Sequence, residues 1–146
     1  MVQGEFNMRL FNKKLNILVL GSDGMLGYDV FNDLNLRTYQ NSSIINRVVG
    51  LNRQEMEKEY FFSGSCSMLE NFFKYHRHFD FCINCVAMTD TASAENTMEG
   101  RRLSYELNAG FPCRLAKACH KNKTKLIHIS TDYVFSEYCN VYNNGG

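Results

Sequence analysis

The residues of this chain best suited to chemistry are three glycines, Gly21, Gly24 and Gly27, in the spacing G-x-x-G-x-x-G. A short apolar run, residues 15–20, precedes them and has the composition of a buried strand, and an amphipathic stretch from Leu26 follows. The first glycine permits a tight turn, the second lets a phosphate approach, and the third lets the helix pack closely on the strand. Such a turn offers backbone N–H groups and a helix N-terminus to a pyrophosphate. The strand before it and the helix after it favour nucleotide binding over an ordinary glycine-rich turn.

Six cysteines would allow a metal or redox site, but their arrangement does not favour one. Cys82 and Cys85 have C-x-x-C spacing inside an apolar run, and residues three apart on a strand point to opposite faces. His76 and His78 lie in a polar stretch, and no second cysteine pair stands at zinc-ribbon spacing. We therefore expect buried thiols in a reducing compartment, a structural role for His128, and no metal site.

The segments that must position these residues alternate between strand and helix patterns. Strands are predicted at residues 15–20, 44–51, 60–62, 79–87 and 125–130. Helices are predicted after the glycine turn, around residues 68–73, and over residues 96–122, where Pro112 marks a kink or break. The inward face of that long helix would carry Leu103, Leu107, Phe111, Leu115 and Ala118. Strands separated by helices predict an α/β, Rossmann-like, doubly wound parallel sheet.

Length and composition indicate one domain and exclude some partners. With 146 residues the chain fits a single domain over residues 14–146, after an N-terminal extension at residues 1–13. No apolar run approaches the roughly 20 residues of a membrane helix. The net charge of +1 gives no electrostatic case for nucleic acid or an anionic membrane. Residues 1–13 lack the apolar core of a secretory signal, so we expect a cytoplasmic protein.

Four segments occur in an order and spacing that resemble the dTDP-4-dehydrorhamnose reductase family, a branch of the extended short-chain dehydrogenases/reductases. They are the glycine turn and the strings I-N-C-V-A-M-T at residues 83–89, L-N-A at residues 107–109 and I-H-I-S-T-D-Y-V-F at residues 127–135. Family members reduce the 4-keto group of a nucleotide-linked 6-deoxysugar with NADPH or NADH, in dTDP-L-rhamnose biosynthesis. The resemblance, over roughly residues 14 to 138, implies an NAD(P)H-dependent oxidoreductase with a nucleotide-sugar substrate.

The resemblance also implies roles for particular residues. Pyrophosphate contacts fall on Gly21, Gly24, Met25, Leu26 and Gly27. Contacts near the adenine fall on Ser63 and Gly64, and contacts to the ribose and nicotinamide fall on Val86, Ala87 and Met88. Thr131 takes the position of the catalytic hydroxyl, and Thr131, Asp132 and Tyr133 would contact the substrate.

The end of the second strand bears on the choice of cofactor. An NAD site usually offers a carboxylate there for the ribose 2′-hydroxyl. This chain has the neutral Asn52, followed by Arg53, whose guanidinium can hold a 2′-phosphate. We therefore expect NADPH to be preferred over NADH.

Two departures from the family pattern limit what the chain is expected to do alone. Ala92 stands where the family has an aspartate, and none of the eight tyrosines has a lysine four residues on, so a Tyr-x-x-x-Lys proton donor is absent. The chain therefore has the features of the cofactor-binding half of a longer enzyme, truncated after the fifth strand and without its substrate domain. We expect it to bind a dinucleotide without reducing the sugar, and to self-associate through an open sheet edge as a homo-oligomer.

Two alternatives stay open at this point. One is a non-catalytic, dinucleotide-binding regulatory subunit of the same family. The other is a related nucleotide-sugar epimerase or dehydratase, which is disfavoured because those enzymes usually carry S-S-x-x-V-Y-G after the fifth strand, where this chain has S-T-D-Y-V-F.

Overall fold

A computed structural model describes residues 14–40, 44–59, 61–62, 66–76 and 78–130. In chain order the elements are β1 (Leu15–Leu20), α2 (Met25–Tyr39), β2 (Ile45–Leu51), α3 (Arg53–Lys58), α4 (Cys66–Tyr75), β3 (Phe81–Asn84), α5 (Thr91–Asn96), α6 (Met98–Tyr105), the π-helix η1 (Glu106–Gly110), α7 (Phe111–Lys121) and β4 (Lys125–His128). The predicted extension at residues 1–13 lies outside the described residues.

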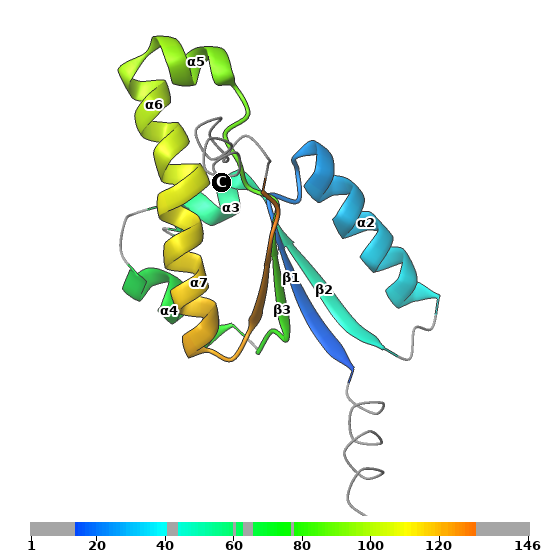
Figure 1. Ribbon diagram of the computed structural model, residues 1–146. Helices are drawn as coiled ribbons and strands as arrows, with labels where there is room; N and C mark the ends of the chain where they lie inside the picture. The colour runs from blue at the N-terminus through cyan, green and yellow to red at the C-terminus, as the bar shows by residue number, and fades with distance from the viewer. Residues whose placement is uncertain (1–13, 41–43, 60, 63–65, 77, 131–146) are drawn as a thin grey trace, which may run out of the picture.

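The strands form one parallel sheet in the order β2-β1-β3-β4. Helix α2 lies on one side of the sheet and α4 and α7 lie on the other (Figure 1). The chain steps from β1 outward to β2 and then crosses back to β3 on the far side of β1. The predicted Rossmann-like α/β fold is confirmed, and its switch in strand order lies between β1 and β3.

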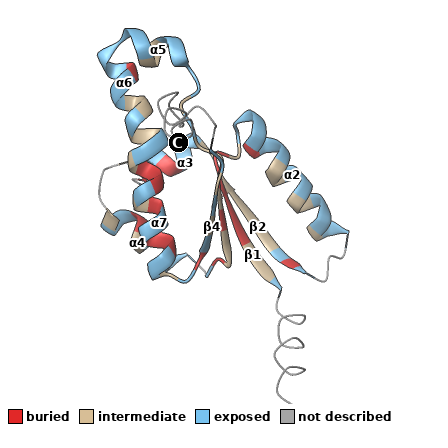
Figure 2. Ribbon diagram, viewed as in Figure 1, coloured by how far each residue is buried: buried red, intermediate tan, exposed pale blue. Residues whose placement is uncertain are grey.

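Two apolar layers hold the helices on the sheet (Figure 2). Alternate β1 residues face opposite sides, as strand geometry requires. Ile17 and Val19 pack towards α2, while Leu18 and Leu20 belong to the larger cluster formed with α4 and α7. The larger cluster also holds Phe61, Leu69, Phe72, Phe111 and Leu115, all buried.

The two thiols of the C-x-x-C segment point to opposite faces, as their spacing predicts. Cys82 is buried in the larger cluster, whereas Cys85 packs against the α2 side. Burial raises the pKa of the Cys82 thiol, and its hydrogen bond with Cys119 raises it further. Within the described part of the chain, no three His, Cys, Asp or Glu side chains gather to hold a metal ion.

The predicted strand at residues 60–62 is wrong for its described residues. Phe61 and Phe62 form a turn, and the Phe61 N–H donates to the Met56 carbonyl at 3.0 Å. The Phe61 ring is wholly buried against Phe72 and Phe111. Burial of this ring beside α4 and α7 overrides the strand propensity of the segment. The described sheet therefore has four strands, and the strand predicted as the fifth is β4.

The long helix predicted over residues 96–122 is three elements, α6, η1 and α7. It begins two residues late because Thr97 is extended, with φ −127° and ψ 145°, and its hydroxyl caps α6 by accepting the Gly100 N–H. Pro112 lies in the first turn of α7 and does not interrupt that helix. The irregularity in the segment is the π-helix η1, which ends just before α7. The strands predicted at 79–87 and 125–130 are shorter, at Phe81–Asn84 and Lys125–His128.

In the described sheet β4 is an edge strand. Ile127 and Ile129 are 44% and 40% exposed there. The open edge is therefore present among these residues, and self-association stays a prediction. Among the described helices, none is long and apolar enough to cross a membrane.

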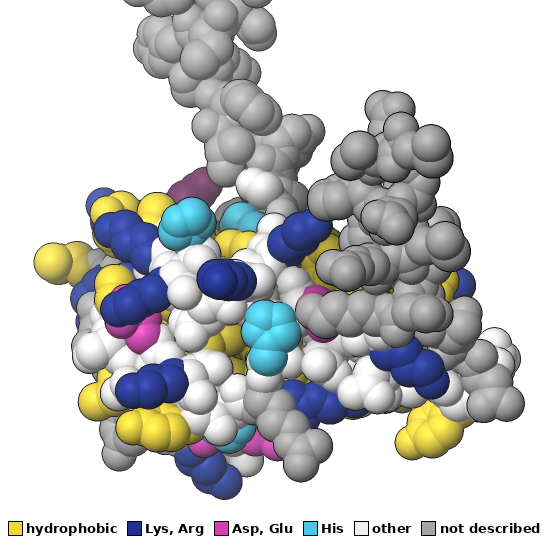
Figure 3. Space-filling view, turned by 90° about the horizontal axis from the view of Figure 1, so that it is seen from below, with side chains coloured by type: hydrophobic (Ala, Val, Ile, Leu, Met, Phe, Trp, Pro, Cys, Tyr) yellow, Lys and Arg dark blue, Asp and Glu magenta, His cyan; other side chains and the backbone are white. Residues whose placement is uncertain are grey.

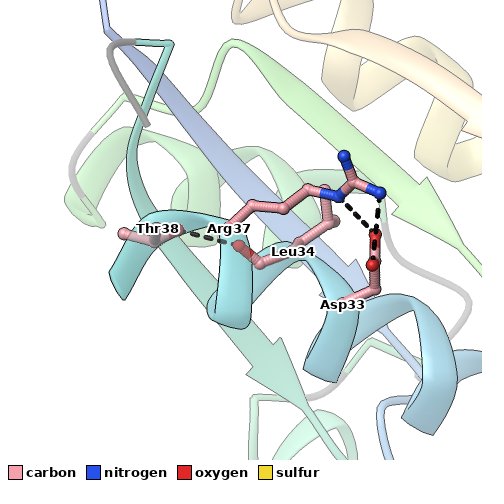
Figure 4. Close-up of polar contacts among 4 residues, drawn as sticks. All are labelled: Asp33, Leu34, Arg37 and Thr38. Atoms are coloured by element: carbon pink, nitrogen blue, oxygen red, sulfur yellow. Dashed lines mark hydrogen bonds and ion pairs between the residues drawn. The ribbon is translucent and has the colours of Figure 1, made fainter. Parts of the chain in front are cut away.

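Away from the glycine turn, exposed side chains make contacts that stabilise individual helices. On the outer face of α2, the Arg37 guanidinium donates to the Asp33 carboxylate at 2.7 and 3.3 Å, and the Thr38 hydroxyl donates to the Leu34 carbonyl at 2.9 Å (Figure 4). Lysine, arginine and histidine side chains gather at the amino ends of the strands (Figure 3). Basic residues occupy the last turns of α2, α4 and α7, where cations complement the helix dipoles.

Candidate functional site

The glycine turn joins the carboxyl end of β1 to α2. Gly21 has φ +76°, a conformation that side chains disfavour. The Gly24 N–H donates to the Gly21 carbonyl at 3.0 Å, closing the turn. The N–H groups of Gly21 and Ser22 both donate to the Leu51 carbonyl, at 2.9 and 3.2 Å, so the turn is fixed to the end of β2.

Gly27 lets the first turn of α2 lie directly on this turn. It is buried, and a Cβ atom added there would meet the Gly21 carbonyl oxygen at 2.0 Å. No other residue fits without moving the backbone. This is the close packing that the third glycine predicts.

The N-terminus of α2 faces outward at the switch in strand order. Gly24 is the N-cap, with φ −77° and ψ 161°, and supplies no side chain to the helix end. The N–H groups of Met25, Leu26 and Gly27 have no acceptor within the helix, because first-turn donors never do. Met25 is 91% exposed, so an anion can reach these donors along the helix axis.

The segment after β3 lies against the same turn. The Cys85 N–H donates to the Leu20 carbonyl at 3.0 Å. A Cβ added to Gly21 would lie 3.3 Å from the Val86 nitrogen. The structure therefore brings Val86 beside the glycine turn and leaves the following Ala87 exposed and Met88 half-buried.

Asn108, in η1, holds this segment by its backbone. Its Oδ1 accepts the Met88 N–H at 2.8 Å, and its Nδ2 donates to the Met88 carbonyl at 3.0 Å. No role for Asn108 is predicted from the sequence, although this residue belongs to the L-N-A string. The two partners lie 20 residues apart, so no local pattern signals the contact.

Asn52 and Arg53, at the end of β2, begin α3. Asn52 forms a capping box: its Oδ1 accepts the Glu55 N–H at 2.9 Å, and its N–H donates to the Glu55 carboxylate at 2.8 Å. Arg53 extends from the first helical position, where its Nε pairs with Glu57 at 2.9 Å. Both side chains of that pair are more than half exposed, at 71% and 52%.

A second polar contact joins β3 to β4 at the same edge of the sheet. The Asn84 Oδ1 accepts the Val86 N–H at 3.1 Å, so its Nδ2 faces the His128 Nδ1, also at 3.1 Å. The His128 ring therefore lies against a wholly buried asparagine. The structural role expected of His128 stays a prediction.

Several predicted site residues lie outside the described residues. They are Ser63, Gly64, Thr131, Asp132 and Tyr133. Ala92, which stands where an aspartate was expected, lies on the short helix α5, whose N-cap is Asp90.

The described residues fit a dinucleotide. Among the described residues, the close contact at Gly27 and the N–H groups at the start of α2, which no side chain caps, leave backbone donors for a pyrophosphate. Arg53 lies on the β2 side of the turn and Val86 to Met88 lie on the β3 side. A dinucleotide bound at the glycine turn would extend towards both.

Comparison with known proteins identifies the family of this chain. Residues 15–143 match the family model described as RmlD substrate binding domain. A dTDP-4-dehydrorhamnose reductase of Mycobacterium tuberculosis is 48% identical over 59 residues, which is 40% of this chain and 18% of that protein. The reductase of the same name from Mycolicibacterium smegmatis is 48% identical over 56 residues, 38% of this chain and 16% of that protein. These alignments span less than a fifth of either relative.

Solved structures share the fold over most of this chain. A dTDP-4-dehydrorhamnose reductase of Clostridium acetobutylicum superimposes with a TM-score of 0.63 at 26% identity, covering 83% of this chain and 38% of that one. A UDP-rhamnose synthase of Acanthamoeba polyphaga mimivirus gives 0.63 at 17% identity, over 85% of this chain and 39% of that one. The second likeness shows the fold alone.

Proposed function

Since the chain belongs to the RmlD substrate binding domain family, we propose that it is the dinucleotide-binding part of an NAD(P)H-dependent reductase. The substrate class we propose is a nucleotide-linked 4-keto-6-deoxysugar, after the relatives named dTDP-4-dehydrorhamnose reductase. The observation that carries the proposal is the glycine turn. It lies at the switch in strand order, and its backbone N–H groups face outward.

Each described site residue has a binding or positioning role in this proposal. The N–H groups of Met25, Leu26 and Gly27 would hold the pyrophosphate, and Gly24 leaves room for it. Val86, Ala87 and Met88 would line the nicotinamide half, with Met88 fixed by Asn108. When bound, a reduced nicotinamide supplies a hydride to the keto carbon.

Arg53 supports a preference for NADPH. Its pair with Glu57 is exposed, and exposed ion pairs contribute little, so the guanidinium is free to turn to a 2′-phosphate. Asn52 offers no carboxylate to a ribose 2′-hydroxyl, and its carboxamide caps α3.

The substrate side of the proposal involves Thr131, Asp132 and Tyr133. The Thr131 hydroxyl would donate a hydrogen bond to the sugar carbonyl oxygen, where negative charge develops during reduction. A threonine hydroxyl has no pKa suited to proton donation near neutrality, so the proton must come from another group. We therefore expect the 146-residue chain to bind the cofactor and not to turn over the sugar.

Isothermal titration of the 146-residue protein with NADPH and NADH tests the proposal directly. We expect both to bind, NADPH more tightly. Asn32→Asp, on the exposed side of α2, should leave both affinities unchanged. Absence of binding by both cofactors would refute the proposed function, and tighter binding of NADH would refute the cofactor preference alone.

A further inference from the structure

The π-helix η1 stands between the core-packed helix α7 and the segment that follows β3. Its defining bond runs from the Phe111 N–H to the Glu106 carbonyl, five residues back. Asn108 lies in the middle of η1 and holds the Met88 backbone through both ends of its carboxamide. The register of η1 therefore decides whether Asn108 faces Met88.

An ion pair brackets this π-helix. The Arg114 guanidinium meets the Glu106 carboxylate through both terminal nitrogens: Nη2 donates to Oε1, and Nη1 donates to Oε2 at 3.4 Å. The side chain of Arg114 is 14% exposed and that of Glu106 is 30% exposed. Water screens this pair far less than it screens the exposed pair of Glu99 with Arg102 on α6, whose side chains are 72% and 75% exposed.

The π-turn brings the two side chains of this pair into line. Residues 106 and 114 are eight apart, which in a regular α-helix is about 800°, or two turns and about 80°. The extra residue of a π-turn removes roughly 100° of this, so both side chains come within about 20° of one line along the helix. The ion pair therefore favours the π register over the α register.

Gly110 makes room for the pair. A Cβ added there would lie 2.9 Å from Glu106 Oε2 and 3.3 Å from Arg114 Nη1. The carboxylate thus rests over the backbone of the π-helix itself. A methyl group at this position would displace the end of a flexible side chain and would not move the backbone.

We propose that Glu106 and Arg114 are positioning residues of the cofactor site: their ion pair holds η1 in the register that directs Asn108 to Met88. The inference rests on the proposed function, because Met88 matters as part of the nicotinamide half of that site. Without the pair, η1 can relax towards an α-helix while α7 stays anchored by Phe111 and Leu115. Asn108 then rotates by about 100° and releases Met88.

The test compares variants that disturb the Glu106–Arg114 pair with a matched variant of the exposed Glu99–Arg102 pair. Glu106→Gln removes the charge, Gly110→Ala crowds the carboxylate, and Glu99→Gln is the control. Hydrogen exchange of the Met88 amide is followed by NMR, with the Leu18 amide as internal reference. We expect Met88 exchange to rise at least about ten-fold in Glu106→Gln and Gly110→Ala, and to stay unchanged in Glu99→Gln.

A ligand readout separates positioning from simple destabilisation. Affinity for NADPH should fall about ten-fold in the pair variants, while affinity for ADP-ribose 2′-phosphate, which lacks the nicotinamide, stays the same. If Glu106→Gln does not fold, Gly110→Ala and the neutral double variant Glu106→Gln/Arg114→Met give the same readouts. Unchanged Met88 exchange, or equal losses for both ligands, would overturn the inference. A wild type that binds neither ligand would refute the proposed function alone, since the exchange measurement needs no ligand.

Discussion

Replacement of Gly24 by aspartate should strengthen the fold and weaken the binding site at once. Gly24 is the N-cap of α2, its backbone angles suit any residue, and among the described residues a Cβ there would meet only the Gly21 carbonyl oxygen, at 3.3 Å. Aspartate is a favoured N-cap, and its charge complements the helix dipole. Its carboxylate would accept from the same first-turn N–H groups that the proposal gives to the pyrophosphate.

The two effects have opposite signs and measurable sizes. The carboxylate at the helix N-terminus should add about 0.3–1 kcal/mol to the free energy of unfolding. For a chain of this length, that is a rise in Tm of roughly 1–4 °C. A phosphate that loses one charge-assisted hydrogen bond loses about 1.5–3 kcal/mol, so the Kd for NADPH should rise roughly 10- to 150-fold.

Urea unfolding and isothermal titration of the same protein samples measure both quantities. Gly24→Asn is the matched variant, because it caps the helix without adding charge, and should weaken binding less. Gly27→Ala should lower the free energy of unfolding, which Gly24→Asp should raise. The 2.0 Å contact with the Gly21 carbonyl oxygen forces a backbone shift that costs about 1–3 kcal/mol of stability. Wild-type NADPH affinity in Gly24→Asp would refute the placement of the pyrophosphate on this turn.

Three other predictions concern single side chains. Arg53→Ala should weaken NADPH binding roughly ten-fold or more and leave NADH binding nearly unchanged in the same titration; equal losses would exclude a 2′-phosphate contact. Hydrogen bonds from the Ser93 side chain and backbone lower the pKa of Asp90 below its ordinary value of about 3.9. The contribution of Asp90 to stability is therefore present at neutral pH and lost as the pH falls through the folded-state pKa, and acid unfolding of Asp90→Asn should lack this component. The exposed Cys113 should react quickly with a thiol reagent, whereas the buried Cys82 should react only on unfolding, as peptide mass spectrometry can measure.

The glycine turn could be predicted from the sequence because all of its determinants are local. The apolar run, the three glycines and the amphipathic helix are contiguous, and Gly21 and Gly27 have steric reasons within the turn, the positive φ of Gly21 and the 2.0 Å contact of Gly27 with the Gly21 carbonyl oxygen. Strand periodicity likewise predicted that Cys82 and Cys85 diverge, since alternation along a strand does not depend on the rest of the fold.

The parts that sequence analysis missed depend on contacts between distant segments. Phe61 lies in a run typical of a strand, but Phe72 and Phe111, far along the chain, enclose its ring in the core. Asn108 contacts Met88 across a loop and two helices. Neither outcome follows from residue type or spacing within a window of a few positions.

The spacing of the apolar residues over positions 103–115 fits a helix with one π-turn better than it fits a regular α-helix. One helix face is predicted to carry Leu103, Leu107, Phe111 and Leu115. Each step of four residues turns an α-helix by about 400°, so each side chain is rotated by about 40° from the one before, or roughly 120° over the three steps. A regular helix of this length would carry Leu103 away from the side on which Leu115 is buried. One π-turn absorbs nearly the whole rotation, and Pro112, which has no N–H to donate, is the second residue after the π-helix. The apolar spacing of this segment and the ion pair of Glu106 with Arg114 thus favour the same irregular turn, from which Asn108 reaches Met88.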